Sequence, residues 1–207
     1  MIVEPIRDRR AERHEATKAE ILAAAWELVR AEGLAALTLR DLAAKVGMRP
    51  PSLYSYFDSK NAIYDAMFLQ GNQELLRRTA AVPEFHDPVE ALRWQAHSVV
   101  EFGTEDPARA QLLFMRTIPG FEPSPETYEV ATEVLALGTA HLERAGIPAQ
   151  FMDLWTGVVS GLVWQQIANE PGGDRWTRLV DDAVDMFLAH INKHISVDEP
   201  KKRRDVE

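Results

Sequence analysis

Cysteine is absent from this sequence, which excludes disulfides, thiolate nucleophiles and cysteine-ligated zinc sites. Long apolar runs are absent too: 46% of the residues are hydrophobic, but no uninterrupted run approaches the roughly 20 residues of a membrane-spanning helix. No basic-then-apolar signal segment opens the chain, because its first arginines precede a mixed helix. Sustained period-two alternation, the mark of a strand, is also missing. We therefore expect an all-α, soluble, cytoplasmic protein without a membrane partner.

Residues 38–60, TLRDLAAKVGMRPPSLYSYFDSK, carry the densest local pattern in the chain. Thr38 and Asp41 are spaced as a capping-box-like pair, and Gly47 stands where a left-handed residue ends a helix. The apolar positions return at helical spacing on both sides of this glycine, at Leu39, Leu42, Ala43, Val46, Leu53, Tyr54 and Phe57. A helix, a glycine-containing turn and a second short helix predict a helix-turn-helix, whose second helix enters the major groove of DNA.

At these residues the sequence resembles the TetR family of bacterial transcriptional regulators, whose pattern runs roughly T-x-x-x-L-A-x-x-x-G-V-S-x-x-x-L-Y-x-Y-F-x-S-K. The run LYSYFDSK separates this resemblance from that of other three-helix cores. The motif resemblance covers about residues 17–81, and beyond them only the architecture agrees. The matching positions are Thr38, Leu42, Ala43, Val46, Gly47, Ser52, Leu53, Tyr54, Tyr56, Phe57, Ser59 and Lys60.

The resemblance implies a homodimer that binds a palindromic double-stranded DNA operator, acts as a repressor and responds to a small-molecule effector. It implies no enzymatic activity, no cofactor and no metal. In this interpretation one group of residues positions the helix-turn-helix on DNA phosphates, namely Thr38, Arg40, Tyr54, Tyr56 and Lys60. A second group faces the groove, namely Arg49, Pro50, Ser52 and Ser55.

The sequence departs from the family pattern at the start of the second short helix. The family usually has Ser or Thr where this chain has Arg49, and an arginine side chain accepts no hydrogen bond and so is no N-cap. Pro50 and Pro51 lack backbone N–H groups, so this first turn has fewer donors that need a cap. The helix is still expected to start here. Arg49 is then a phosphate clamp, a bidentate reader of guanine or a solvated surface arginine.

The net charge of −9 is at first sight unsuited to DNA. Residues 1–60, however, contain ten Lys and Arg against nine Asp and Glu, whereas the rest of the chain contains 13 against 23. An acidic body behind a nearly neutral head would repel DNA everywhere except at the reading surface. The alternative is that the acidic charge only confers solubility.

The chain order predicts about nine helices in three parts and a tail. A charged arm up to about Arg13 either reaches DNA or is a frayed terminus. Gly33 ends the first helix. The predicted parts are a helix-turn-helix domain at 1–60, a connecting helix at 61–81, a ligand-binding and dimerisation body at 82–195 and a flexible tail at 196–207, which includes the basic run 201–204. Within the body, helices are expected near 88–104, 107–117, 124–146, 148–170 and 174–195.

The last two predicted helices indicate a dimer interface. Residues 151–167 are apolar nearly all round, which requires cover on both sides, and Gly157, Ser160 and Gly161 allow close approach of another helix. A two-fold interface of two helices from each subunit fits this pattern, although the same faces fit an internal core. The predicted interface residues are Val158, Leu162, Trp176, Val180, Val184 and Phe187.

Aromatic and polar residues of the body are candidates for an effector pocket with a mainly apolar or aromatic ligand. Aromatics at helical spacing are also common core residues, so each candidate has this alternative role. The candidates are Trp94, His97, Phe114, Phe121, Tyr128, Trp155 and Gln165.

No catalytic constellation is found. Ser160 lies in GVVSG, but the spacing and the preceding segment do not match a nucleophile elbow. His190 and His194 lack a third metal ligand at a suitable spacing. Residues 171–173 form a Pro-Gly-Gly turn without the lysine of a phosphate-binding loop. The alternatives to a ligand-responsive repressor are an activator or constitutive DNA binder of the same fold, and an enzyme or interaction protein with a borrowed three-helix module.

Overall fold

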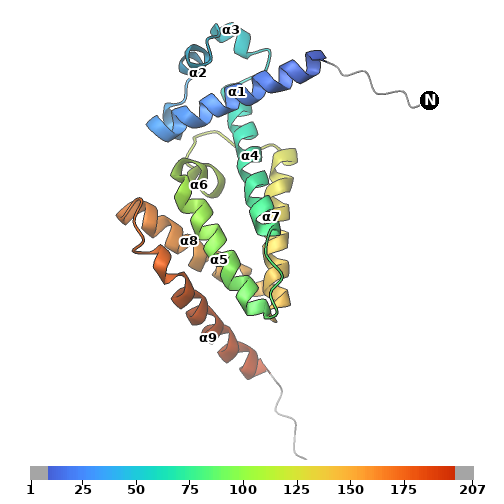
Figure 1. The fold of residues 1–207 in the computed structure, drawn as a ribbon, viewed down its shortest axis with the longest axis vertical. Helices are drawn as coiled ribbons and strands as arrows, with labels where there is room; N and C mark the ends of the chain where they lie inside the picture. The colour runs from blue at the N-terminus through green and yellow to red at the C-terminus, as the bar shows by residue number, and fades with distance from the viewer. Residues whose placement is uncertain (1–8, 199–207) are drawn as a thin grey trace, which may run out of the picture. The chain divides into compact units, whose positions relative to one another are not determined.

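A computed structural model of the protein describes residues 9–198. Nine α-helices and three short 3-10 helices account for its regular structure, and the described range contains no strand, which confirms the all-α prediction (Figure 1). The α-helices are α1 Arg9–Glu32, α2 Leu39–Lys45, α3 Pro50–Leu53, α4 Lys60–Ala80, α5 Pro88–Glu105, α6 Pro107–Phe114, α7 Pro125–Arg144, α8 Met152–Asn169 and α9 Val180–Asp198.

The chain divides into two compact units. Unit 1 contains the residues up to Glu74 together with Asp106–Ala131, and unit 2 contains Leu75–Glu105 together with the residues from Thr132 on. Helices α4 and α7 therefore contribute residues to both units. The predicted boundaries at residues 60 and 82 do not coincide with this division, because α6 and the start of α7 group with the N-terminal helices.

The core of unit 1 forms where α1, α2, α3 and α4 present apolar side chains to one another. Tyr64 of α4 is completely buried, and its hydroxyl donates a hydrogen bond to the carbonyl oxygen of Leu34. Burial raises the pKa of this phenol. The residues that fill this core with at most 2% exposure are Ile21, Ala25, Val29, Leu37, Leu42, Ala43, Leu53, Ile63, Tyr64 and Met67.

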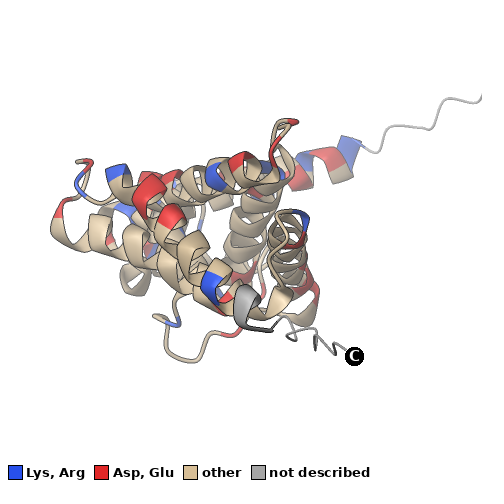
Figure 2. Cartoon of the chain, turned by 90° about the horizontal axis from the view of Figure 1, so that it is seen from below, with Lys and Arg blue, Asp and Glu red and all other residues tan. Residues whose placement is uncertain are grey.

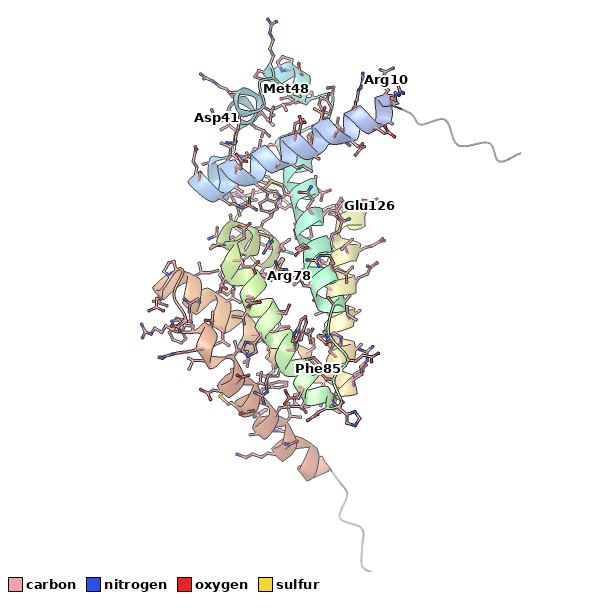
Figure 3. The ribbon with its side chains drawn as sticks, viewed as in Figure 1. Arg10, Asp41, Met48, Arg78, Phe85 and Glu126 are labelled. Carbon is pink, nitrogen blue, oxygen red and sulfur yellow. The ribbon has the colours of Figure 1, made fainter. Side chains whose placement is uncertain are left out.

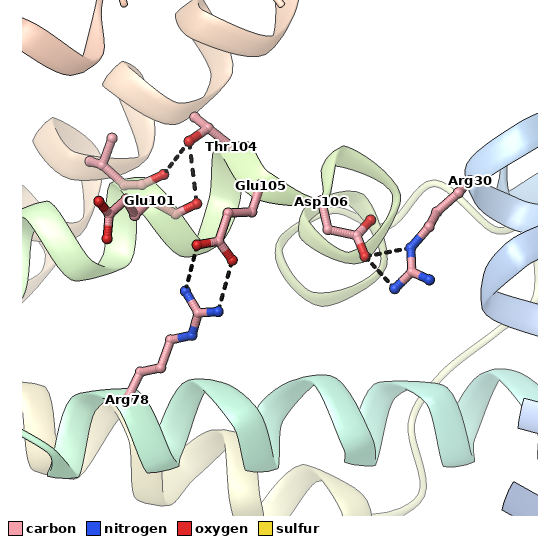
Figure 4. A network of polar contacts seen from close by, with 7 residues as sticks. Arg30, Arg78, Glu101, Thr104, Glu105 and Asp106 are labelled. Atoms are coloured by element: carbon pink, nitrogen blue, oxygen red, sulfur yellow. Dashed lines mark hydrogen bonds and ion pairs between the residues drawn. The ribbon is translucent and has the colours of Figure 1, made fainter. Parts of the chain in front are cut away.

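Two polar contacts attach α6 and α7 to the rest of unit 1. Asp106 caps α6 by accepting from the Arg109 amide at 3.1 Å, and Arg30 of α1 donates to the same carboxylate from Nε and Nη2 at 2.8 Å each (Figure 4). Asp65 of α4 accepts from the Ser124 amide at 2.7 Å and from the Thr127 hydroxyl at 2.6 Å at the start of α7. Buried or half-buried acidic groups thus fix the first turns of both helices.

Unit 2 is built on the mutual packing of α5, α8 and α9. Gly103 is required where α5 meets α8, because a Cβ there would lie 2.6 Å from Val163 Cγ1. At the exposed edge between α5 and α9, Arg93 pairs with Asp181 and Asp185 at 3.2 and 2.7 Å. The buried apolar residues that form the main core cluster of this unit are Leu92, Ala96, Val100, Leu142, Ile147, Trp155, Val159, Val163, Val180, Val184, Phe187 and Ile191.

Several predicted helix ends differ from the structure. The helix expected at 107–117 ends at Phe114. The helix expected from residue 174 begins as a 3-10 turn, Thr177–Leu179, before α9 starts at Val180. Trp176 therefore lies before α9 and not within it, as the helix expected at 174–195 would have placed it.

No helix within residues 9–198 combines the length and the apolar character needed to cross a membrane. The basic run 201–204 and Arg7 lie outside the described residues.

Candidate nucleic-acid interface

The turn between α2 and α3 is fixed by local hydrogen bonds. The Thr38 hydroxyl oxygen accepts from the Asp41 amide at 3.1 Å and donates to the Asp41 carboxylate at 2.5 Å, so the predicted capping pair forms. Gly47 adopts the left-handed φ of 67°. Its amide donates to Ala44, and the next amide, of Met48, donates to Ala43 at 2.8 Å. These hydrogen bonds end α2 and direct the chain into α3. Figure 3 labels Asp41 and Met48, which precede and follow the glycine in the sequence.

Helix α3 begins as expected without a side-chain cap. Arg49 is the N-cap residue in extended conformation and makes no capping hydrogen bond, while prolines fill the first positions of the helix. The helix is four residues long, and only Leu53 of it is buried. Its other side chains are exposed, which leaves Pro50 and Ser52 accessible.

The residues predicted to contact DNA lie on exposed or half-buried positions of the α2–α3 segment and the start of α4. Tyr54 is 54% exposed despite its aromatic ring. Thr38, Arg40, Arg49, Pro50, Ser52 and Ser55 are also exposed, and Tyr56 and Lys60 are half-buried. The Lys60 ammonium lies 5.4 Å from the centre of the Tyr64 ring, which orients this side chain at the N-terminus of α4.

His14 is a neighbour of this surface that no sequence pattern indicates. Its ring stacks on the ring of Tyr56 with centroids 4.7 Å apart and an interplanar angle of 26°. Its Nε2 lies 3.3 Å from the Ser55 carbonyl oxygen. The contact joins residues more than 40 positions apart, so no local sequence pattern indicates it.

The positively charged side chains of this surface differ in whether they form ion pairs. Lys45 pairs with Glu27 of α1 at 2.8 Å, and this contact lowers the pKa of the Glu27 carboxyl. Within residues 9–198, Arg40 and Arg49 form no ion pair. Their charge is therefore available to a ligand anion. Helix α1 carries charges of both signs along its length (Figure 2).

A pocket of about 370 Å³ lies within unit 1. Three predicted ligand-binding residues line it: Phe114, Phe121 and Tyr128. Phe68 of α4 and Leu112 of α6 contribute further apolar walls. The Phe121 ring contacts the Tyr64 ring with centroids 5.6 Å apart, so the pocket wall touches the buried core of the same unit.

The other four predicted ligand residues do not line this pocket. Trp155 is buried and packs against Phe187 at a ring distance of 5.1 Å, because an aromatic at helical spacing fills the core equally well. His97 is exposed and meets Asp181 at 3.0 Å, and it lowers the pKa of that carboxyl. Gln165 is exposed on α8, and Trp94 is half-buried on α5.

The predicted interface residues fall on two different faces. Val180, Val184 and Phe187 are at most 2% exposed inside unit 2, so they offer nothing to a partner subunit, and the assignment is corrected for them. An apolar stripe along a helix indicates a buried face. It does not show whether the same chain or a partner subunit covers that face. Val158, Leu162 and Trp176 are half-buried, and the Trp176 amide donates to Gln166 at 2.8 Å.

Within the described residues no group of three or more His, Asp or Glu residues is arranged to hold a metal ion. The rings of His190 and His194 lie in tilted contact with centroids 4.1 Å apart, and His194 Nδ1 lies 2.9 Å from the His190 carbonyl oxygen.

Comparison with known proteins agrees with this geometry. Residues 21–67 match the model of the bacterial regulatory proteins of the tetR family. Over 100 residues the chain is 31% identical to YobS, an uncharacterized HTH-type transcriptional regulator of Bacillus subtilis (strain 168), with 48% of this chain and 52% of YobS aligned. The match thus spans only about half of that relative.

Solved structures show the same fold over a larger part of the chain. The TetR family transcriptional regulator PfmR of Thermus thermophilus gives a TM-score of 0.63 at 22% identity, over 82% of this chain and 97% of PfmR. The transcriptional regulator FadR of Bacillus subtilis, solved in complex with stearoyl-CoA, gives 0.70 at 16% identity, over 84% of this chain and 98% of FadR.

The exposed helix-turn-helix, which shares a buried core with α1 and α4, defines a DNA-binding module of transcriptional regulators. The particular module is that of the TetR family, and the chain has the fold of a TetR-family transcriptional regulator. The resemblance found in the sequence is confirmed. This is a family of regulators and not of enzymes.

Proposed function

We propose that this protein is a ligand-responsive repressor that binds a palindromic operator as a homodimer. The observation that carries the proposal is that a set of hydrogen-bond donors around α3 is exposed. The helices that carry these donors pack on a completely buried core. Arg40 and Arg49 supply charge, and the hydroxyls of Ser52 and Tyr54 supply hydrogen bonds. Such groups bind phosphates and base edges, which together give position and sequence preference.

The homodimer follows from the size of the reading element. A helix of four residues reaches too few bases to select one site in a genome, and two-fold symmetric pairs double the contacts. We propose that the outward faces of α8 and α9 form the interface. Gly157 and Gly161 of α8 face open space, and Leu154 and Met186 are 42% and 63% exposed, so a partner helix would find room and apolar contact there.

The effector site of the proposal is the pocket of unit 1. Its aromatic walls suit a mainly apolar or aromatic ligand, and the complex of FadR with stearoyl-CoA supports ligand binding within this fold. A contact path leads from the pocket to the DNA-binding helices within the same unit. Phe121 touches Tyr64, and Tyr64 hydrogen-bonds the carbonyl of Leu34, four residues before the N-cap of α2. A ligand that displaces Phe121 would act on α2 through this path.

Release from DNA requires that the effector bind one conformation of the protein more tightly than the other, because only differential affinity shifts an equilibrium. The test is footprinting on the DNA that flanks the gene of this protein, with excess competitor DNA. A protected palindrome that a ligand screen can release supports the proposal. Absence of protection on any DNA at low salt contradicts it.

A further inference from the structure

A second pocket, of about 560 Å³, lies within unit 2. Its walls come from the end of α4, the loop between α4 and α5, the start of α5 and the C-terminal half of α7. Figure 3 labels Phe85 in this loop. The pocket contains none of the residues that the sequence assigned to DNA or effector binding, and its apolar walls include Val82, Phe85 and Leu137.

His141 of α7 is the unusual member of this lining. The residue is only 6% exposed, and its Nδ1 is buried without a hydrogen-bond partner among the described residues. Burying a polar nitrogen without a partner costs stability, so native proteins rarely leave one unmatched. This nitrogen has almost no accessible surface, so a ligand would meet the other edge of the imidazole ring that lines the pocket.

Arg144 lies one helical turn beyond His141 and lines the same pocket. Its side chain is exposed and forms no ion pair within residues 9–198. Burial, and then the nearby charge of Arg144, lower the pKa of His141, so the imidazole is neutral at pH 7 and has one N–H to donate. A guanidinium and a neutral imidazole on one helix face together form a set of donors for a carboxylate.

We infer that this pocket binds a small carboxylic acid with an apolar body. The carboxylate lies between the Arg144 guanidinium and the His141 imidazole, and the body lies against Val82, Phe85 and Leu137. The negative charge of Glu84, in the same wall, repels the carboxylate of the ligand. An acid is favoured over an amine because two donors stand together on α7, whereas Glu84 is a single exposed carboxylate on a loop.

Isothermal titration calorimetry on the full chain at pH 7.5 tests this inference with three probes that differ only in the head group. We expect 3-phenylpropionate to bind about tenfold more tightly than 3-phenylpropanol or 3-phenylpropylamine, the size of a charge-assisted contact. Arg144→Gln should remove about that factor, and Glu84→Gln should tighten binding a few-fold because a repulsive charge is lost. Arg178→Gln, an exposed arginine of the same unit outside the pocket, is the matched control and should leave the affinity unchanged.

Three results would overturn the inference. The first is absence of binding of 3-phenylpropionate at millimolar concentration. The second is equal affinity for the alcohol and the acid. The third is loss of binding in Phe114→Ala, in the pocket of unit 1, with unchanged binding in Arg144→Gln. No DNA is present in this experiment, so its outcome is independent of the proposed regulatory function.

Discussion

The guanidinium of Arg30 in α1 donates two hydrogen bonds of 2.8 Å to one carboxylate oxygen of Asp106, the residue that caps α6 (Figure 4). Asp106 is 7% exposed, so its charge is balanced almost entirely by Arg30 and by the helix amide that it accepts from. One side chain thus holds together α1, which packs against the helix-turn-helix, and α6, which lines the pocket of unit 1.

This arrangement predicts that Asp106→Ala destabilises the protein. The substitution removes the cap and leaves the amides at the start of α6 unmatched, which costs about 1–3 kcal/mol. Asp106→Asn keeps an acceptor for the Arg109 amide and should cost clearly less. Urea unfolding followed by circular dichroism measures both. Equal stability of wild type and Asp106→Ala would show that neither contact contributes.

His14 is expected to position the surface that reads DNA. His14→Ala removes the ring stacked on Tyr56 and should weaken operator binding about three- to tenfold, which corresponds to the roughly 0.5–1.5 kcal/mol of an aromatic pair. The stability should change little because His14 is half-exposed. His14→Phe retains the stack and is the matched control. Fluorescence anisotropy on the footprinted operator measures the effect, and unchanged affinity in His14→Ala would remove His14 from the site.

Tyr64 is expected to couple the effector pocket to the DNA-binding helices. Tyr64→Phe keeps the ring that contacts Phe121 but deletes the hydrogen bond to Leu34. Effector affinity should therefore persist, while the ligand concentration that releases DNA rises several-fold. Titrating the effector against a fixed protein–operator complex measures this, with direct ligand binding as the control. Unchanged release in Tyr64→Phe would contradict the contact path.

His141 predicts a loss of stability in weak acid. Its pKa in the folded protein lies below the ordinary value of 6.5, so the unfolded chain takes up the proton first as the pH falls. Its contribution to the free energy of unfolding is therefore complete above pH 6.5 and is lost as the pH drops through the folded pKa. His141→Gln should flatten this part of the profile, whereas His86→Gln, at an exposed loop histidine, should not. Identical profiles for wild type and His141→Gln would show that His141 is not the group responsible.

Local chemistry explains which features the sequence could predict. Gly47 adopts the expected left-handed φ, Gly33 follows the last residue of α1 as expected, and the Thr38–Asp41 pair forms, because each depends on residues within one helical turn. The helix-turn-helix was identifiable for the same reason. The stacking partner of Tyr56, His14, could not be identified from the sequence, because that contact depends on how α1 crosses the turn.

The body was harder to predict because one apolar pattern serves several purposes. Phe121 and Trp155 are both aromatic residues of the predicted body, yet one lines a pocket and the other fills the core. Phe187 belongs to an apolar helix face. Such a face is equally typical of an internal core and of a dimer interface. No sequence pattern indicated the pocket of unit 2. Its histidine, His141, is unusual only because its Nδ1 lacks a hydrogen-bond partner, and this is visible only in the structure.

The most direct test of the central claim is a salt-resolved titration of the protein against the DNA flanking its gene, with competitor DNA present. We predict binding that prefers one palindrome over the competitor and weakens linearly with the logarithm of salt concentration. Lys60→Ala should reduce this slope by about one unit, as expected for the loss of one phosphate contact. Lys193→Ala, an exposed lysine of α9, should leave it unchanged. Absence of binding to any DNA at low salt would contradict the account.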